Sequence, residues 1–234
     1  SGVEAWSGGD DHVYMNSWEG LTNLLKDVGF SYDVVSDDCL KQGALKRDEL
    51  GMLVLPMGIR MDERAGEAIR VFVREGGVVL ADFAPGLFNG LMRPVRGGVL
   101  ADVFGVQSAG ALPGMAREQV GLGGGARDRL GQKVEGLSSL GTWLSATDLT
   151  PAGATALART SRGTPVLMAH EYGQGKAILL NALARDYQVW RTLGTEMPFR
   201  QSVAGVLRWA GLTPRVECSV HAGRYGERPL QATE

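Results

Sequence analysis

Short apolar runs alternate with an amphipathic segment in the first hundred residues, and this order leaves few folds open. Residues 52–55 and 78–81 are continuous apolar runs typical of strands covered on both faces. Between them, residues 62–75 place apolar side chains at helical spacing, start with acidic residues and stop at Gly76 and Gly77. A strand, a helix and a strand in this order predict parallel pairing, and therefore an α/β doubly wound, mainly parallel sheet.

The remaining segments extend this pattern. Residues 3–6 and 31–35 are expected to be strands, and residues 17–28 and 199–210 helices, the first of them capped by Asn16. Two β-type runs, 166–172 and 176–182, are separated by a short glycine loop, which predicts a late antiparallel hairpin. We expect residues 1–222 to form one domain with a Gly-rich irregular insertion at about 97–150. Residues 223–234 are expected to form a loose tail.

Composition excludes several classes of protein. The chain is 44% apolar with a net charge of −2, so it is expected to fold as a globular protein. No basic run and no apolar run near 20 residues occurs, so neither nucleic acid nor a membrane is an expected partner. Cys39 and Cys218 are too far apart for a metal knuckle, and no cofactor motif occurs, so no cofactor is expected. A start at Ser1 without Met suggests an excised or processed segment.

Charge is distributed unevenly along the chain. Residues 1–75 hold 14 acids and 8 bases, a net of −6, whereas residues 151–234 hold 6 acids and 10 bases, a net of +4. Such a distribution is compatible with ordinary solvated faces. It is also compatible with complementary surfaces for head-to-tail association of identical chains.

Several segments in this order resemble one known family. Residues 30–40 (FSYDVVSDDCL), 53–56 (LVLP), 68–82 (AIRVFVREGGVVLAD) and 172–180 (YGQGKAILL) are similar to the trimerisation domain of family 42 β-galactosidases. The resemblance implies a flavodoxin-like fold of the class I glutamine amidotransferase-like type. It also implies a non-catalytic accessory domain that forms homo-oligomers, trimers among them, or contacts other domains of a larger parent protein. The catalytic glutamates of that family lie in a separate (β/α)8 barrel, for which this chain has no room.

Amidotransferase chemistry itself is not expected. It requires a cysteine on a tight turn after a strand, activated by a histidine and a glutamate, but the loop after residues 78–81 reads DFAPG. His170 and Glu171 are adjacent on an expected strand, so their side chains point to opposite faces. We therefore assign no catalytic residue and no metal ligand, since three consecutive residues such as 10–12 rarely converge on one ion.

Two loops at the expected carboxyl edge of the sheet combine aromatic, acidic and basic side chains. This edge is where doubly wound folds bind ligands. Three readings remain open: an interface anchor, a site for a carbohydrate or small polyol, and a hydrolase of unassigned chemistry. Trp6 and Trp18 also suit simple core packing. The ligand or interface candidates are Trp6, Asp10, Asp11, His12, Tyr14, Asp82, Phe83 and Arg93.

Overall fold

A computed structural model describes residues 11–110, 112–122 and 140–214 of the chain. Its helices are α2 (Asp11–Asp27), α3 (Asp37–Lys41), α4 (Glu63–Arg74), α5 (Ala101–Phe104), α7 (Asp186–Leu193) and α8 (Met197–Trp209). The strands of its main sheet are β1 (Met52–Leu55), β3 (Val78–Ala81), β6 (Met115–Leu122), β7 (Thr142–Ala146), β9 (Thr155–Thr160), β10 (Pro165–Tyr172) and β11 (Gly175–Leu179). Short strands β2 (Arg60–Met61) with β4 (Phe88–Asn89), and β5 (Val106–Ser108) with β8 (Leu149–Pro151), form two small additional sheets.

The main sheet has the order β1-β3-β11-β10-β9-β6-β7. The α/β alternation and the late hairpin are confirmed: β3 pairs in parallel with β1 and β11, and β10 pairs antiparallel with β11. The sheet is nevertheless less parallel than the sequence predicted, because the pairings β10–β9, β9–β6 and β6–β7 are also antiparallel. These strands come from the middle and the later part of the chain, where β9 reaches β10 through a short turn rather than a helical crossover.

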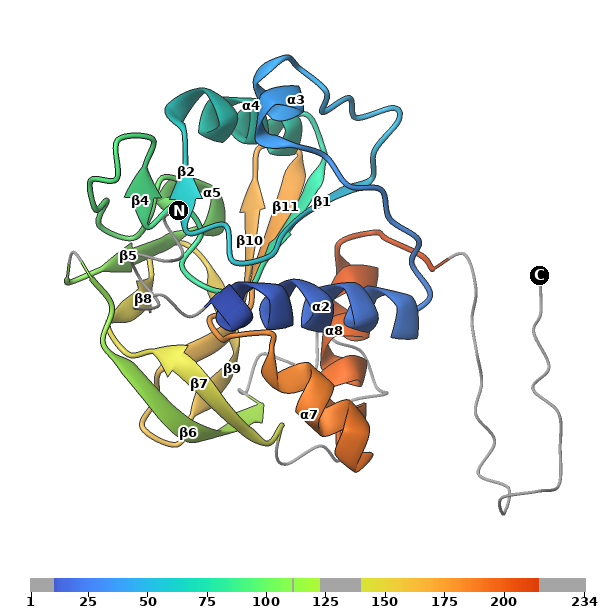
Figure 1. Ribbon diagram of the computed structural model, residues 1–234, viewed down its shortest axis with the longest axis vertical. Coiled ribbons are helices and arrows are strands. Elements are labelled where there is room, and N and C mark those ends of the chain that lie inside the picture. The colour runs from blue at the N-terminus through green and yellow to red at the C-terminus, as the bar shows by residue number, and fades with distance from the viewer. Residues whose placement is uncertain (1–10, 111, 123–139, 215–234) are drawn as a thin grey trace, which may run out of the picture.

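Helices cover both faces of the sheet, so the molecule has three layers (Figure 1). Successive residues of β3 point to opposite sides: Val78 and Leu80 join the core beneath α2 and α8, and Val79 and Ala81 join the core beneath α4. Both cores are well filled, since these four side chains are at most 3% exposed. Burial on both faces explains why the strand is a continuous apolar run.

The predicted helix at 62–75 forms as α4, and Asp62 caps it by accepting a hydrogen bond from the Arg64 backbone nitrogen at 2.8 Å. Two other expectations are wrong in part. Residues 31–35 form no strand, and Val34 is 75% exposed there. Helix α2 begins at Asp11 rather than after Asn16. The strand expected at 3–6 and the tail at 223–234 lie outside the described residues.

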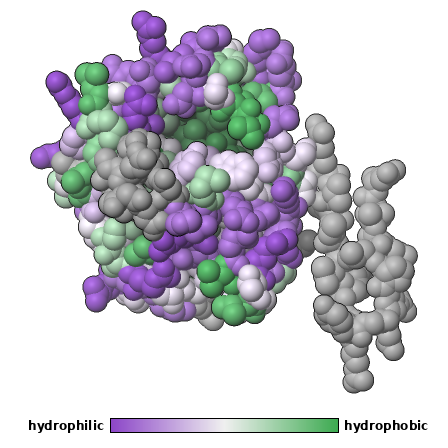
Figure 2. Space-filling model, viewed as in Figure 1, coloured by the Kyte–Doolittle hydropathy of each residue, from purple (hydrophilic) through white to green (hydrophobic). Residues whose placement is uncertain are grey.

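The outer surface in the view of Figure 2 is mostly hydrophilic, with small separate groups of apolar residues. Within the described parts of the chain, no helix is long and apolar enough to cross a membrane.

Candidate functional site

The carboxyl edge of the parallel strands is built from the loops that follow β1, β3 and β11. Asp82 comes directly after β3, and its Oδ1 accepts two hydrogen bonds at 2.7 Å, from the backbone nitrogens of Met57 and Phe83. Met57 belongs to the loop after β1. One carboxylate therefore ties together the loops that follow two neighbouring strands.

Asp82 is fully buried, and this burial changes its proton affinity. Removal from water disfavours the charged form and raises the pKa of the carboxyl to about 7, although the backbone N–H groups of Phe83 and Met57 partly oppose this effect. No ion pair to Asp82 occurs among the described residues. The Asp82 side chain thus links two loops of the protein and is not exposed for binding a ligand.

Apolar side chains close over this edge. We call them the edge cluster, and its members come from α2, the three loops and β7: Val13, Met57, Ile59, Phe83, Leu87, Ala146 and Leu183. Each is at most 8% exposed. Beside the cluster lies a cavity of about 20 Å³ lined in part by Ala84, Asp148 and Asn181. This volume suits about one water molecule, far less than the hundreds of cubic ångströms that a sugar-sized ligand needs.

The backbone is unusual at the same edge. Met57 and Ala84 have φ values of 42° and 39°, a region that residues other than glycine seldom adopt. Both residues adjoin the hydrogen bonds of Asp82, which offset this conformational cost. These two turns could not be predicted from the sequence, because the residue with positive φ is not a glycine in either of them.

Those predicted site residues that the structure describes do not form one exposed surface, because some of them are buried. Trp6 and Asp10 lie outside the described residues. Contrary to the expectation of a loop, Asp11, His12 and Tyr14 lie in the first turn of α2, where the side chains of His12 and Tyr14 are exposed. Asp82 and Phe83 are buried, and Arg93 is exposed on the loop after β4 rather than directly after β3. The edge cluster thus occupies the place where a crevice was expected.

Residues with the chemistry of an amidotransferase are dispersed. Cys39 is exposed on α3, while Asp82, Phe83 and Ala84 occupy the loop after β3. His170 is held in place by the carbonyl oxygen of Val103, 2.8 Å from its Nδ1. No cluster of three metal-binding side chains occurs in the described parts of the chain.

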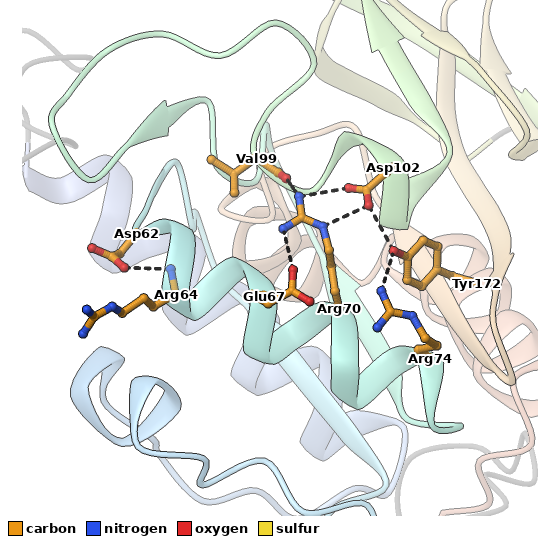
Figure 3. A network of polar contacts seen from close by, with 8 residues as sticks. All are labelled: Asp62, Arg64, Glu67, Arg70, Arg74, Val99, Asp102 and Tyr172. Atoms are coloured by element: carbon orange, nitrogen blue, oxygen red, sulfur yellow. Dashed lines mark hydrogen bonds and ion pairs between the residues drawn. The ribbon is translucent and has the colours of Figure 1, made fainter.

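A polar network that sequence reasoning missed joins α4, α5 and β10 (Figure 3). The Arg70 guanidinium donates to Asp102 at 2.9 and 3.2 Å and to the carbonyl oxygen of Val99 at 2.5 Å. The Tyr172 hydroxyl donates to the same Asp102 carboxylate at 3.1 Å. These partners are 32 and 70 residues apart in sequence, so no local pattern indicates their contact.

Comparisons with known families and solved structures identify proteins that this chain resembles. The family model described as β-galactosidase trimerisation domain matches residues 23–203. Comparison with curated proteins gives no significant match.

Among solved structures, the β-galactosidase from Bacillus circulans sp. alkalophilus has 20% identity and a TM-score of 0.62, covering 88% of this chain and 28% of that one. The β-galactosidase from Rahnella sp. R3 has 22% identity and a TM-score of 0.57, covering 78% of this chain and 27% of that one. The chain therefore spans less than a third of the length of these two enzymes. A cytoplasmic protein from Salmonella typhimurium has 13% identity and a TM-score of 0.57, but there the likeness covers 82% of this chain and 85% of that one. At these identities, the structural likeness establishes the fold.

Proposed function

The chain belongs to the β-galactosidase trimerisation domain family, and we propose from this that it forms the trimer of a larger β-galactosidase-like glycoside hydrolase. The family match over residues 23–203 is the observation that carries the proposal. In this role the domain is non-catalytic: it holds subunits together, while another part of the parent protein performs hydrolysis. The closed carboxyl edge supports this role, because the edge cluster occupies the place where α/β folds commonly bind substrates.

We propose the finer fold class on similar grounds. Helices on both faces of the parallel strands β1, β3 and β11 suit a flavodoxin-like, amidotransferase-like domain. The sheet runs without a break from β1 to β7, which supports one domain over residues 1–222 with the middle of the chain built into it. The Gly-rich segment is then only partly irregular, because β6 and β7 belong to the sheet.

Among the predicted site residues, we propose that the exposed His12, Tyr14 and Arg93 serve contacts with other protein chains. A carbohydrate site has less support. It required carboxylates and aromatic rings on a shared surface, whereas Asp82 and Phe83 are both 0% exposed.

Measurement of the oligomeric state tests the proposal. Light scattering after size exclusion, over a hundredfold range of concentration, is expected to give three times the mass of one chain. Sedimentation equilibrium provides an independent check of the stoichiometry. A single monomeric species at every concentration would overturn the proposal.

A further inference from the structure

The loop after β4 lies on the outside of the molecule and carries an exposed apolar residue. We call residues 89–96 the β4 loop; Figure 1 shows it at the outer edge of the molecule, next to α4. Leu91 in this loop is 74% exposed. An exposed leucine is unremarkable by itself, so the meaning of this residue depends on how the loop is held and on its surroundings.

The β4 loop is held in one conformation by its own polar groups. Asn89 Oδ1 accepts hydrogen bonds at 3.0 Å from the backbone nitrogens of Leu91 and Arg93. The Arg60 guanidinium donates to the carbonyl oxygen of Gly90 at 2.9 Å. Met92 adopts a φ of 60°, which costs energy for a residue other than glycine. A loop fixed in this way loses little further entropy when it binds a partner.

The exposed charges of the β4 loop are positive. Arg93 and Arg96 are both exposed, and neither forms an ion pair with any residue that the structure describes. The loop therefore combines an exposed leucine with two exposed arginines that have no ion-pair partner in the described parts of the chain. Arginine and large apolar side chains are the groups that most often anchor protein interfaces.

A groove beside the loop has the opposite charge. Its volume is about 430 Å³. It is lined by Glu63, Glu67, Arg70 and Val99 and, from the β4 loop itself, by Asn89 and Val95. Glu63 is exposed and forms no ion pair within the described residues, and Glu67 contacts only Arg70, at 3.5 Å. Arg70 is already bound to Asp102, as Figure 3 shows. The groove thus combines half-buried valines with a net negative charge, because Arg70 is shared by Glu67 and Asp102 while Glu63 forms no ion pair within the described residues.

We infer that the β4 loop of one chain docks into this groove on a second copy of the chain. The inference rests on the proposed trimerisation and names the surface that performs it. A three-fold ring needs a heterologous contact, in which every copy offers one patch to one neighbour and a different patch to the other. The exposed side chains of the loop, Leu91, Arg93 and Arg96, and the groove around Glu63 and Val99 are two such patches. They adjoin on each copy, because Asn89 and Val95 of the loop also line the groove. In the contact, Leu91 packs on the valines and Arg93 pairs with Glu63.

Charge reversal in the chain tests this contact directly. Arg93→Glu and Glu63→Arg are each expected to weaken association about tenfold or more, because each places like charges in contact. The double variant R93E/E63R restores the attraction and is expected to associate within about threefold of the unchanged chain. Arg208→Glu, at an exposed arginine near the end of α8, is the matched control and should leave association unchanged.

A second pair of variants tests the apolar part of the contact without changing charge. Leu91→Ser is expected to weaken association, and Leu193→Ser, at a comparably exposed leucine on α7, is expected not to. Circular dichroism and thermal unfolding establish that each variant is folded. Sedimentation equilibrium then gives each association constant.

The possible results distinguish an error in the proposed interface from an error in the proposed trimerisation. If the unchanged chain forms trimers but the Arg93, Glu63 and Leu91 variants associate normally, the surface is wrong and trimerisation stands. Loss of association only in Leu193→Ser would place the interface on α7 instead. A double variant that folds but fails to recover contradicts the pairing of Arg93 with Glu63. An unchanged chain that stays monomeric overturns both the surface and the proposed function.

Discussion

The carboxylate of Asp82 accepts a hydrogen bond from the backbone nitrogen of Met57 at 2.7 Å, which joins the loop after β3 to the loop after β1. Both loops lie at the edge where a doubly wound sheet commonly binds its ligand. Here Met57 and Phe83 turn into the edge cluster and close that edge. An aspartate at this edge could belong to a ligand site, but the Asp82 carboxylate instead holds two loops together.

Replacement of Asp82 by asparagine tests this role through pH. The folded-state pKa, about 7, lies above the ordinary value of 3.8, so the protonated carboxyl favours folding. This contribution is full below the unfolded pKa, is lost as pH rises towards 7, and is absent above it. Between pH 5 and pH 8 the unchanged chain should lose about 2–3 kcal/mol more unfolding free energy than Asp82→Asn. Urea unfolding at both pH values measures the difference.

Asparagine keeps an oxygen that can accept from Met57 and Phe83, so the variant is expected to fold. Asp82→Ala, in contrast, leaves two buried N–H groups without an acceptor and should cost about 2–4 kcal/mol. Identical pH profiles for the unchanged chain and Asp82→Asn would show that this carboxyl does not titrate in the predicted range.

Gly20 on α2 approaches the loop after β11 so closely that an added Cβ would overlap the carbonyl oxygen of Ala184. Glycine to alanine inside a helix ordinarily stabilises by about 1 kcal/mol. In this position we expect Gly20→Ala to destabilise by about 1–3 kcal/mol, because backbone atoms must move apart. Asn16→Ala, on the exposed part of the same helix, is the control and should be neutral or slightly stabilising. Chemical denaturation compares them, and a stabilised Gly20→Ala would contradict the close approach.

The parts of the fold that the sequence predicts best are those encoded by neighbouring residues. Helix α4 is an example, because Asp62 caps it and its apolar stripe recurs at helical spacing. Residues 31–35 show the opposite case. Their apolar content suggests a strand, but a strand forms only where a partner is available, and no pattern along the chain reports this. Val34 consequently stays exposed.

The candidate site was harder to predict because it, too, depends on contacts between residues that are distant in the sequence. Asp82 was expected to face a crevice, since an aspartate after a strand resembles a ligand-binding residue. Its carboxylate accepts a hydrogen bond from Met57, 25 residues away, and the edge cluster beside it includes Leu183, about a hundred residues away. The start of α2 also depends on a distant contact: Val13 packs into the edge cluster, and this favours helix before Asn16.

The contact between Arg70 and Asp102 is expected to stabilise the attachment of α5 to α4. Asp102→Ala removes the acceptor for both Arg70 and Tyr172, and because these groups are partly exposed we expect a loss of about 1 kcal/mol. Asp38→Ala is the matched control. Its side chain is 83% exposed and contacts only Lys41, at 3.6 Å, so its effect should remain below about 0.5 kcal/mol.

Acidification should reduce the difference in unfolding free energy between the unchanged chain and Asp102→Ala. Burial alone would raise the pKa of Asp102, but the hydrogen bonds from Arg70 and Tyr172 outweigh it and lower the pKa. A lowered folded-state pKa contributes stability above the unfolded value of about 3.9, and this stability is lost as pH falls through the folded-state pKa. Urea unfolding at pH 7 and pH 3 measures the change, and a constant difference would argue against the ionised contact.

Tyr187 offers a test of one partly buried hydrogen bond between α7 and α2. Its ring is fully buried, and its hydroxyl donates to the Asp27 carboxylate at 2.8 Å, while Arg191 donates to the same oxygen at 2.8 Å. Tyr187→Phe keeps the ring packing and leaves Asp27 bound by Arg191, so we expect a loss of about 1 kcal/mol rather than the larger cost of an orphaned buried charge. Tyr32→Phe, at an exposed tyrosine whose hydroxyl forms no hydrogen bond with any described residue, should change nothing measurable. Equal unfolding free energies for the Tyr187→Phe variant and the unchanged chain would mean that Arg191 alone satisfies Asp27.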